Sequence, residues 1–142
     1  MKKQGSILIE VMASVMILAL STTFIVSTSI QNIDILKERI LLEEVNRAIY
    51  NLTNELKYNM PKEEIEELLG NEKLRFKYDR DFSKKLLNTD IKDLRKGEDI
   101  EISKIGENSI GLKLKIKANI IIEKNMVSVE TEFTKSWWMD EI

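Results

Sequence analysis

The chain has 142 residues, with 22 Lys+Arg against 24 Asp+Glu, a formal net charge of −2, and 43% hydrophobic residues. This length allows one small domain with an appendage and is too short for a two-domain enzyme. The chain contains no cysteine and no histidine. This rules out disulfide scaffolds, zinc sites built from thiolates or histidines, cysteine nucleophiles and Ser-His-Asp catalytic triads. We therefore expect no enzymatic activity, no cofactor and no metal site.

The first long apolar segment runs from residue 6 to residue 30, with Glu10 as its only ionisable side chain. About 20 apolar residues suffice to cross a bilayer core, so this segment predicts a transmembrane helix. Lys2 and Lys3 precede it, and the positive-inside rule then places the N-terminus in the cytoplasm and the rest of the chain outside. A secretory signal peptide fits less well, since its apolar region typically has about 7–15 residues.

Glu10 needs an explanation that a plain membrane anchor does not supply. A carboxylate inside the hydrocarbon boundary costs about 2.5–3.5 kcal/mol even on a lenient scale, and such residues usually mark a functional site with a partner nearby. This position therefore favours a role in which Glu10 meets a cation.

Residues 1–12, MKKQGSILIEVM, resemble the prepilin leader and mature N-terminus of the type IV pilin-like superfamily. The shared pattern is a short basic leader ending in glycine, then an apolar run with glutamate as the fifth mature residue. The resemblance implies that a membrane prepilin peptidase cleaves between Gly5 and Ser6 on the cytoplasmic side and methylates the new amine of Ser6. Glu10 falls at the fifth mature position.

The spacing of Ser6 and Glu10 has a physical meaning of its own. On a helix these residues are i,i+4 neighbours, so the amine created by cleavage can pair with the carboxylate within one chain. Pairing with the amine of a neighbouring subunit would instead bring two charges together inside a helical bundle and set the axial register. We interpret Glu10 as an assembly residue.

Three features favour a minor pilin or pseudopilin over a bulk filament subunit. The mature chain would begin with Ser6 where major pilins commonly have Phe, the span lacks a helix-bending proline because Pro61 is the only one, and the C-terminal cysteine pair of many pilins is absent. Hydroxyl side chains instead populate the outer half of the span, where they can bond carbonyls one turn back or neighbouring helices. These residues are Ser21, Thr22, Thr23, Ser27, Thr28 and Ser29.

The helix is expected to continue beyond the membrane as an amphipathic half, residues 31–59. No glycine or proline occurs between Ile30 and Pro61, and apolar residues recur every three or four positions. The resulting stripe predicts a continuous helix to about Tyr58 whose second half packs on a head domain. The stripe consists of Ile33, Leu36, Ile40, Leu41, Val45, Ala48, Ile49, Leu52 and Leu56.

The head, residues 60–142, begins with a short helix signal from Pro61 to Gly70, with proline in the first turn and glycine at the stop. Its four glutamates predict a solvated face, with an acidic docking face as the alternative. Lys73–Tyr78 alternates as a strand does, and Ile100 and Ile102 predict another short strand. The intervening aspartates lack the ligand spacing of an EF-hand.

The end of the chain predicts a β-hairpin at about residues 111–135, because apolar and polar residues alternate on both sides of a short polar turn. The turn is either Glu123-Lys124 or Lys124-Asn125, and both registers place Lys117 opposite Glu130 or Glu132. One face is then core and the other carries paired charges. Lys113, Lys115 and Lys117 form a strip of lysines on the polar face. Because the facing glutamates offset their charge, we do not expect this strip to bind DNA phosphates.

Trp137 and Trp138 follow the second strand of this hairpin. If the strand continued through them, they would point to opposite faces, leaving one exposed as a partner anchor. The alternative is that both pack against the long helix.

The expected fold is α+β, with a leader (1–5), a transmembrane half-helix (6–30) and an amphipathic half-helix (31–59) packed on a small antiparallel sheet in the head (60–142). The resemblance implies a structural subunit of a type IV pilus, competence pseudopilus or type II secretion pseudopilus, held in the cytoplasmic membrane with its head outside and moved to the cell surface on assembly. It also implies as partners prepilin peptidase, other pilins and an inner-membrane assembly platform. An assembly ATPase would act indirectly, because this chain has no Gly-rich phosphate loop. The alternative is a single-pass, signal-anchored extracytoplasmic binding or sensor domain.

Overall fold

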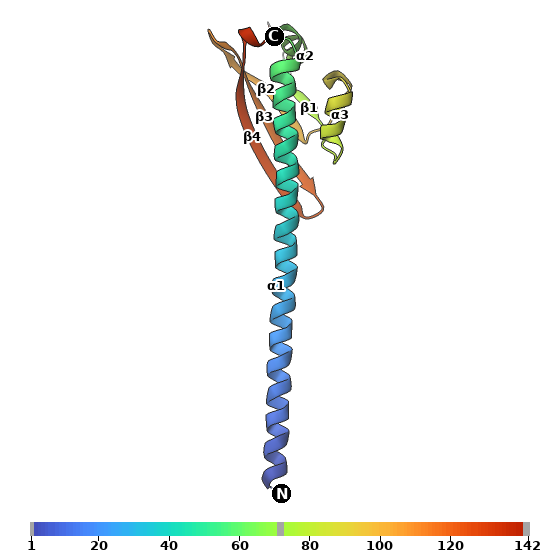
Figure 1. Cartoon of the computed structure of the whole chain (residues 1–142), viewed down its shortest axis with the longest axis vertical. Coiled ribbons are helices and arrows are strands. Elements are labelled where there is room, and N and C mark those ends of the chain that lie inside the picture. Colours follow the sequence, from blue (N-terminus) through green and yellow to red (C-terminus); the bar gives the residue numbers. More distant parts are fainter. Residues whose placement is uncertain (1, 71–72, 141–142) are drawn as a thin grey trace. The chain divides into compact units, whose positions relative to one another are not determined.

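The computed structural model describes residues 2–70 and 73–140, without the side chains of residues 2–4, 6 and 140, and divides into two compact units (Figure 1). The first unit ends at Lys37 and the second begins at Glu38. Helix α1 (Lys2–Asn54) forms the described part of the first unit and continues as the first element of the second. The protein is an α+β structure with a long apolar N-terminal helix and a small four-stranded antiparallel sheet.

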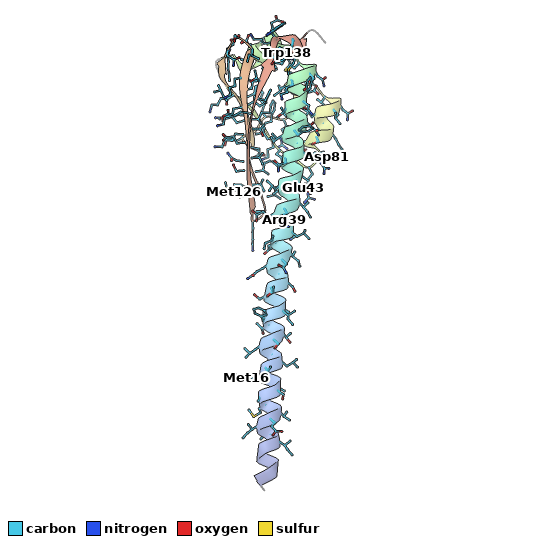
Figure 2. All side chains as sticks on the ribbon, turned by 60° about the vertical axis from the view of Figure 1, so that its left-hand side comes forward. Met16, Arg39, Glu43, Asp81, Met126 and Trp138 are labelled. Carbon is cyan, nitrogen blue, oxygen red and sulfur yellow. The ribbon has the colours of Figure 1, made fainter. Side chains whose placement is uncertain are left out.

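In the first unit, no other described element covers the apolar residues of α1. From Ile7 to Lys37 every described side chain is exposed, and Figure 2 shows them, Met16 among them, projecting around the helix. By length and composition this helix is able to cross a membrane. The unit is therefore a helix whose apolar surface requires cover from outside.

In the second unit, the apolar stripe of α1 is buried from Leu41 onward. Val45, Ala48, Ile49 and Leu52 are almost fully buried, whereas Ile33, Leu36 and Ile40 are exposed. The expectation that the whole stripe packs on the head is therefore wrong for its first three members. Ile33 and Leu36 belong to the first unit. Figure 2 shows the end of the hairpin at Met126 beside the part of α1 that carries Glu43 and Arg39.

The last turn of the long helix changes its hydrogen-bonding pattern. Residues Glu55–Asn59 form a π-helix, η1, after which Met60 is extended. The predicted end at about Tyr58 is thus close to the observed one. The extended conformation of Met60 follows from Pro61, whose ring disfavours the helical conformation in the preceding residue.

Three short helices lie between η1 and β2 in the chain, α2 before strand β1 and the other two after it. Helix α2 (Lys62–Leu69) starts after Pro61 and ends at Gly70, whose φ of 45° suits glycine, so the predicted second helix is confirmed. Helix α3 spans Phe82–Asn88, and the 3₁₀ helix η2 spans Ile91–Asp93.

The sheet has the order β1-β2-β3-β4 with every neighbouring pair antiparallel. Its strands are β1 (Leu74–Phe76), β2 (Ile100–Glu107), β3 (Gly111–Ile122) and β4 (Asn125–Ser136). The hairpin of β3 and β4 turns at Glu123-Lys124, where Glu123 has a φ of 56°. This turn selects one of the two predicted registers, with Lys117 opposite Glu130.

One face of the sheet forms one side of the head's core. Alternate residues of β3, from Leu112 to Ile120, are almost fully buried and belong to one cluster with the buried stripe of α1. Phe76 of β1, Phe82 of α3 and Ile91 of η2 join the same cluster. The alternation in the sequence therefore assigns the two faces of the hairpin correctly.

The two tryptophans differ from the expectation. Trp137 and Trp138 lie in a 3₁₀ helix, η3 (Trp137–Asp140), where they are 57% and 45% exposed and make a T-shaped contact with ring centroids 5.7 Å apart. Neither the strand arrangement nor burial of both against α1 is found. The reason is that pairing with β3 ends at Ser136, so the strand alternation no longer applies.

Candidate processing and assembly site

The predicted cleavage position lies within the helical backbone of α1. Lys2, Lys3, Gly5 and Ser6 are all in this helix; the side chains of Lys2, Lys3 and Ser6 lie outside the described set. Gly5 is exposed, and a Cβ added there would meet nothing within 4 Å. Packing within the described chain therefore does not require glycine, although glycine weakens a helix by about 0.5–1 kcal/mol relative to alanine.

Glu10 lies one helical turn after Ser6 on α1, with its side chain exposed. The two positions share a face of the helix because residues four apart are neighbours. The backbone carbonyl of Glu10 accepts a hydrogen bond from the hydroxyl of Ser14 at 2.8 Å. The helix thus brings together the residues of the predicted new N-terminus and the predicted assembly carboxylate.

Four of the six hydroxyl side chains predicted to bond along the apolar part of α1 donate hydrogen bonds within the helix. Ser21, Thr22, Thr23 and Thr28 each donate to the carbonyl oxygen four residues earlier, at 2.8–2.9 Å. This matches the predicted bonding to carbonyls one turn back. Because these donors are already used, the helix surface stays compatible with hydrocarbon despite its polar residues.

The apolar side chains of this part of α1 lie all around the helix. A helix that is apolar on every side is typical of a membrane span or of a helix enclosed by others, and so large an exposed apolar surface is rare on a soluble monomer. The exposed residues are Ile7, Leu8, Ile9, Val11, Met12, Val15, Met16, Ile17, Leu18, Leu20, Phe24, Ile25, Val26 and Ile30.

In the head, the outer face of the hairpin carries lysines that pair with glutamates. Lys113 lies 3.0 Å from Glu132, and Lys115 lies 2.5 Å from Glu130. The hydrogen bond from Lys113 lowers the pKa of Glu132, and the hydrogen bond to Glu130 raises the pKa of Lys115. Two lysines of the predicted strip, Lys113 and Lys115, therefore pair with glutamates of the opposite strand.

The acidic face of α2 also has partners on other elements. Glu64 pairs with Lys92 at 2.6 Å, and Glu66 pairs with Lys104 at 2.8 Å. The bond to Glu64 raises the pKa of Lys92. Two of the four glutamates in the predicted patch thus hold α2 to its neighbours.

The aspartates of the connecting segments have local structural roles. Asp99 accepts a hydrogen bond from the backbone N–H of Tyr78 at 2.9 Å, and Asp90 accepts one from the N–H of Lys92 at 3.0 Å. Within the described ranges, no group of three or more acidic residues is placed to hold a metal ion.

Sequence reasoning missed Lys135, which is almost fully buried. Its Nζ donates a hydrogen bond to the backbone carbonyl of Lys57 in η1 at 2.6 Å, linking the end of β4 to the end of the long helix. The alternation of β4 contains the signal, because Val127, Phe133 and Lys135 lie an even number of positions apart and so share the core face.

A shallow groove in the head was also missed. Tyr50 and Tyr58 of the long helix line it together with Leu87 of α3, and all three are exposed. Side-chain amides and Glu55 complete the lining. The groove offers an aromatic and polar surface without a catalytic grouping of residues.

No family model, no curated protein and no solved structure matches this chain.

Proposed function

We propose that the protein is a minor pilin or pseudopilin, a structural subunit that prepilin peptidase cleaves after Gly5 and that then assembles through its N-terminal helix. The observation that carries the proposal is the combination at the start of α1: a basic leader, Gly5, and Glu10 as the one ionisable residue of an apolar segment. Within the described part of the chain no packing contact requires glycine at position 5, and in this proposal the peptidase is the partner that recognises it.

The exposed apolar surface of the helix supports a role in which the helix moves from lipid into a bundle of similar helices. Lipid chains and apolar side chains are about equally apolar, so the transfer changes the hydrophobic free energy little. The hydroxyls of Ser21, Thr22, Thr23 and Thr28 bond within the helix, so they need not exchange hydrogen bonds during the move. Charge pairing is then left to fix the register.

In this account Glu10 supplies that register. Cleavage creates a cationic amine at Ser6, and a neighbouring subunit shifted along the bundle can present this amine to Glu10. Charged pairs in a low-dielectric environment depend steeply on geometry, because breaking one leaves a buried charge. Glu10 therefore acts in assembly rather than in catalysis.

The proposed location is the cytoplasmic membrane, with the N-terminus inside and the head outside, and after assembly a pilus or pseudopilus. The proposed partners are prepilin peptidase, other pilins and an assembly platform driven by an ATPase. A membrane-anchored sensor or binding domain is the alternative, which the groove at Tyr50 and Tyr58 would suit.

Glu10→Gln tests the assembly role, with Glu43→Gln on the exposed surface of α1 as the matched control (Figure 2). We expect both variants to be cleaved, but only Glu10→Gln to be lost from filaments or pseudopili recovered from cells. Normal incorporation of processed Glu10→Gln protein would refute the role of the carboxylate.

A further inference from the structure

The outer face of the β3–β4 hairpin changes from charged to apolar along its length. Its cross-strand pairs run from Lys117 and Glu130, through Asn119 and Ser128, to Ile121 and Met126 next to the turn. The hydroxyl of Ser128 donates to the side-chain oxygen of Asn119 at 2.8 Å. Ile121 and Met126 are 68% and 61% exposed, so the end of the hairpin presents an apolar pair to its surroundings.

The apolar pair lies at the end of the head where the chain enters it. Figure 1 shows the hairpin turn beside α1, and Figure 2 shows Met126 beside the part of α1 that carries Glu43 and Arg39. At this level of α1, Leu41 is buried in the core, while its neighbours Ile40 and Leu42 are exposed. The same end of the second unit therefore carries exposed apolar side chains on both the hairpin and the helix.

Chain connectivity keeps this end of the head close to the apolar segment. Only residues 31–37 separate Ile30 from Glu38, the first residue of the second unit. Even a fully extended chain would place these two residues no more than about 28 Å apart. If the segment ending at Ile30 spans a membrane, the membrane surface is within reach of the hairpin turn.

We propose that Ile121 and Met126, together with Ile40 and Leu42, rest in the headgroup region of the outer leaflet and hold the head against a lipid surface. This inference depends on the membrane anchoring in the proposed function. Amphipathic elements bind such surfaces by placing apolar side chains at the boundary between headgroups and acyl chains. Assembly would then have to lift the hairpin from the lipid.

The charges at this end indicate that the contact is hydrophobic rather than electrostatic. Glu38, Arg39 and Glu43 on α1 and Glu123 and Lys124 in the hairpin turn contribute three acids and two bases. This end has no excess of positive charge, so anionic lipid gains no net attraction. The contact should therefore form on neutral phosphatidylcholine and persist at high salt.

The test uses the full chain in phosphatidylcholine vesicles, with single cysteines carrying a nitrobenzoxadiazole fluorophore. The chain has no native cysteine, so Lys124→Cys reports on the turn, Leu18→Cys on the span, and Glu132→Cys on the same face about 26 Å further along the strand. Lipids carrying a nitroxide near the headgroup or deep in the acyl chain act as quenchers.

We expect the shallow quencher to act on the label at 124, the deep quencher to act on the label at 18, and neither to act on the label at 132. Ile121→Thr and Met126→Thr are then added together. Threonine is β-branched and suits an exposed strand, so these substitutions remove the apolar side chains without disfavouring the strand. They should reduce quenching at 124 several-fold. These results would support the lipid contact.

Other outcomes overturn it in distinguishable ways. Quenching at 18 without quenching at 124 would remove the hairpin contact but leave the anchoring intact. A label at 124 that is shielded from water yet not quenched would indicate a second copy of the chain rather than lipid. Absence of quenching at 18 would refute the membrane anchoring and the hairpin contact with it.

Discussion

The two units use similar apolar residues in opposite ways. Leu18 in the first unit is 67% exposed, whereas Leu52 in the second, on the same helix, is fully buried. The head covers its part of α1 with the apolar face of a sheet, while the described part of the first unit has no such cover. One helix therefore lies in two environments, and among the described residues the protein itself supplies only the second.

The two units are also expected to control different properties of the protein, the stability of the head and the assembly of the subunit. Core residues of the head should determine whether the head folds, and residues 7–30 should determine where the protein resides and what it joins. Substitutions that affect one property and not the other are therefore the way to test the comparison.

Gly111→Ala should have the largest effect on the head. A Cβ at this position would lie 2.0 Å from the backbone carbonyl oxygen of Lys135, so the first pair of the hairpin would have to separate. We expect a loss of about 4 kcal/mol or more in the free energy of unfolding. Urea unfolding of the full chain in detergent, followed by hydrogen exchange of β3 amides, measures it.

Gly106→Ala is the control for this substitution, because a Cβ there would meet nothing within 4 Å. A similar loss in both variants would show that the close approach at Gly111 is not the cause.

Leu52→Ala and Leu18→Ala compare the two environments directly. Removing the buried side chain of Leu52 should cost about 2–5 kcal/mol of head stability, while the exposed Leu18 should leave head stability unchanged. The same unfolding measurement applies to both. Equal effects would contradict the division into two independent units.

Lys135→Met should have a smaller effect, because it keeps the length of the buried side chain but removes its hydrogen bond to the carbonyl of Lys57. We expect a loss of about 1–3 kcal/mol, the usual cost of leaving a buried polar group without that partner. Exchange protection should fall most in η1. A gain in stability would show that the hydrogen bond does not offset the cost of burying the amino group.

Glu132→Gln should have the smallest effect, since its partners are at the surface and exposed ion pairs contribute little. The pKa of Glu132 is lowered, so its contribution is present above the unfolded-state pKa and is lost as pH falls through the folded-state pKa. The difference in urea midpoint between wild type and variant should therefore vanish in acid and shrink in high salt. A difference that persists in acid would exclude ionisation as its source.

The sequence predicts the hairpin well because a period of two in β3 and β4 determines both the buried face and the pairing. The sequence does not show at which residue the sheet begins to bury α1, because Ile33, Leu36 and Ile40 fit the same helical stripe as the buried Leu41. Burial there depends on how far the hairpin extends, which is a tertiary property.

The candidate site shows the same limit. Gly5 and Glu10 can be picked out from the sequence because glycine and glutamate are unusual at the start of an apolar helix. Because α1 is helical here, Glu10 lies one turn after Ser6. Lys135 was missed because a lysine near a chain end is usually solvated, and its burial arises from the meeting of β4 with η1. The conformation of Trp137 and Trp138 depends on where strand pairing stops.

Mass analysis of the N-terminus of the protein isolated from cells with an active prepilin peptidase tests the central proposal most directly. The account predicts a chain that begins at Ser6 and carries a methyl group on its amine. A chain that still begins at Met1 in those cells would contradict it.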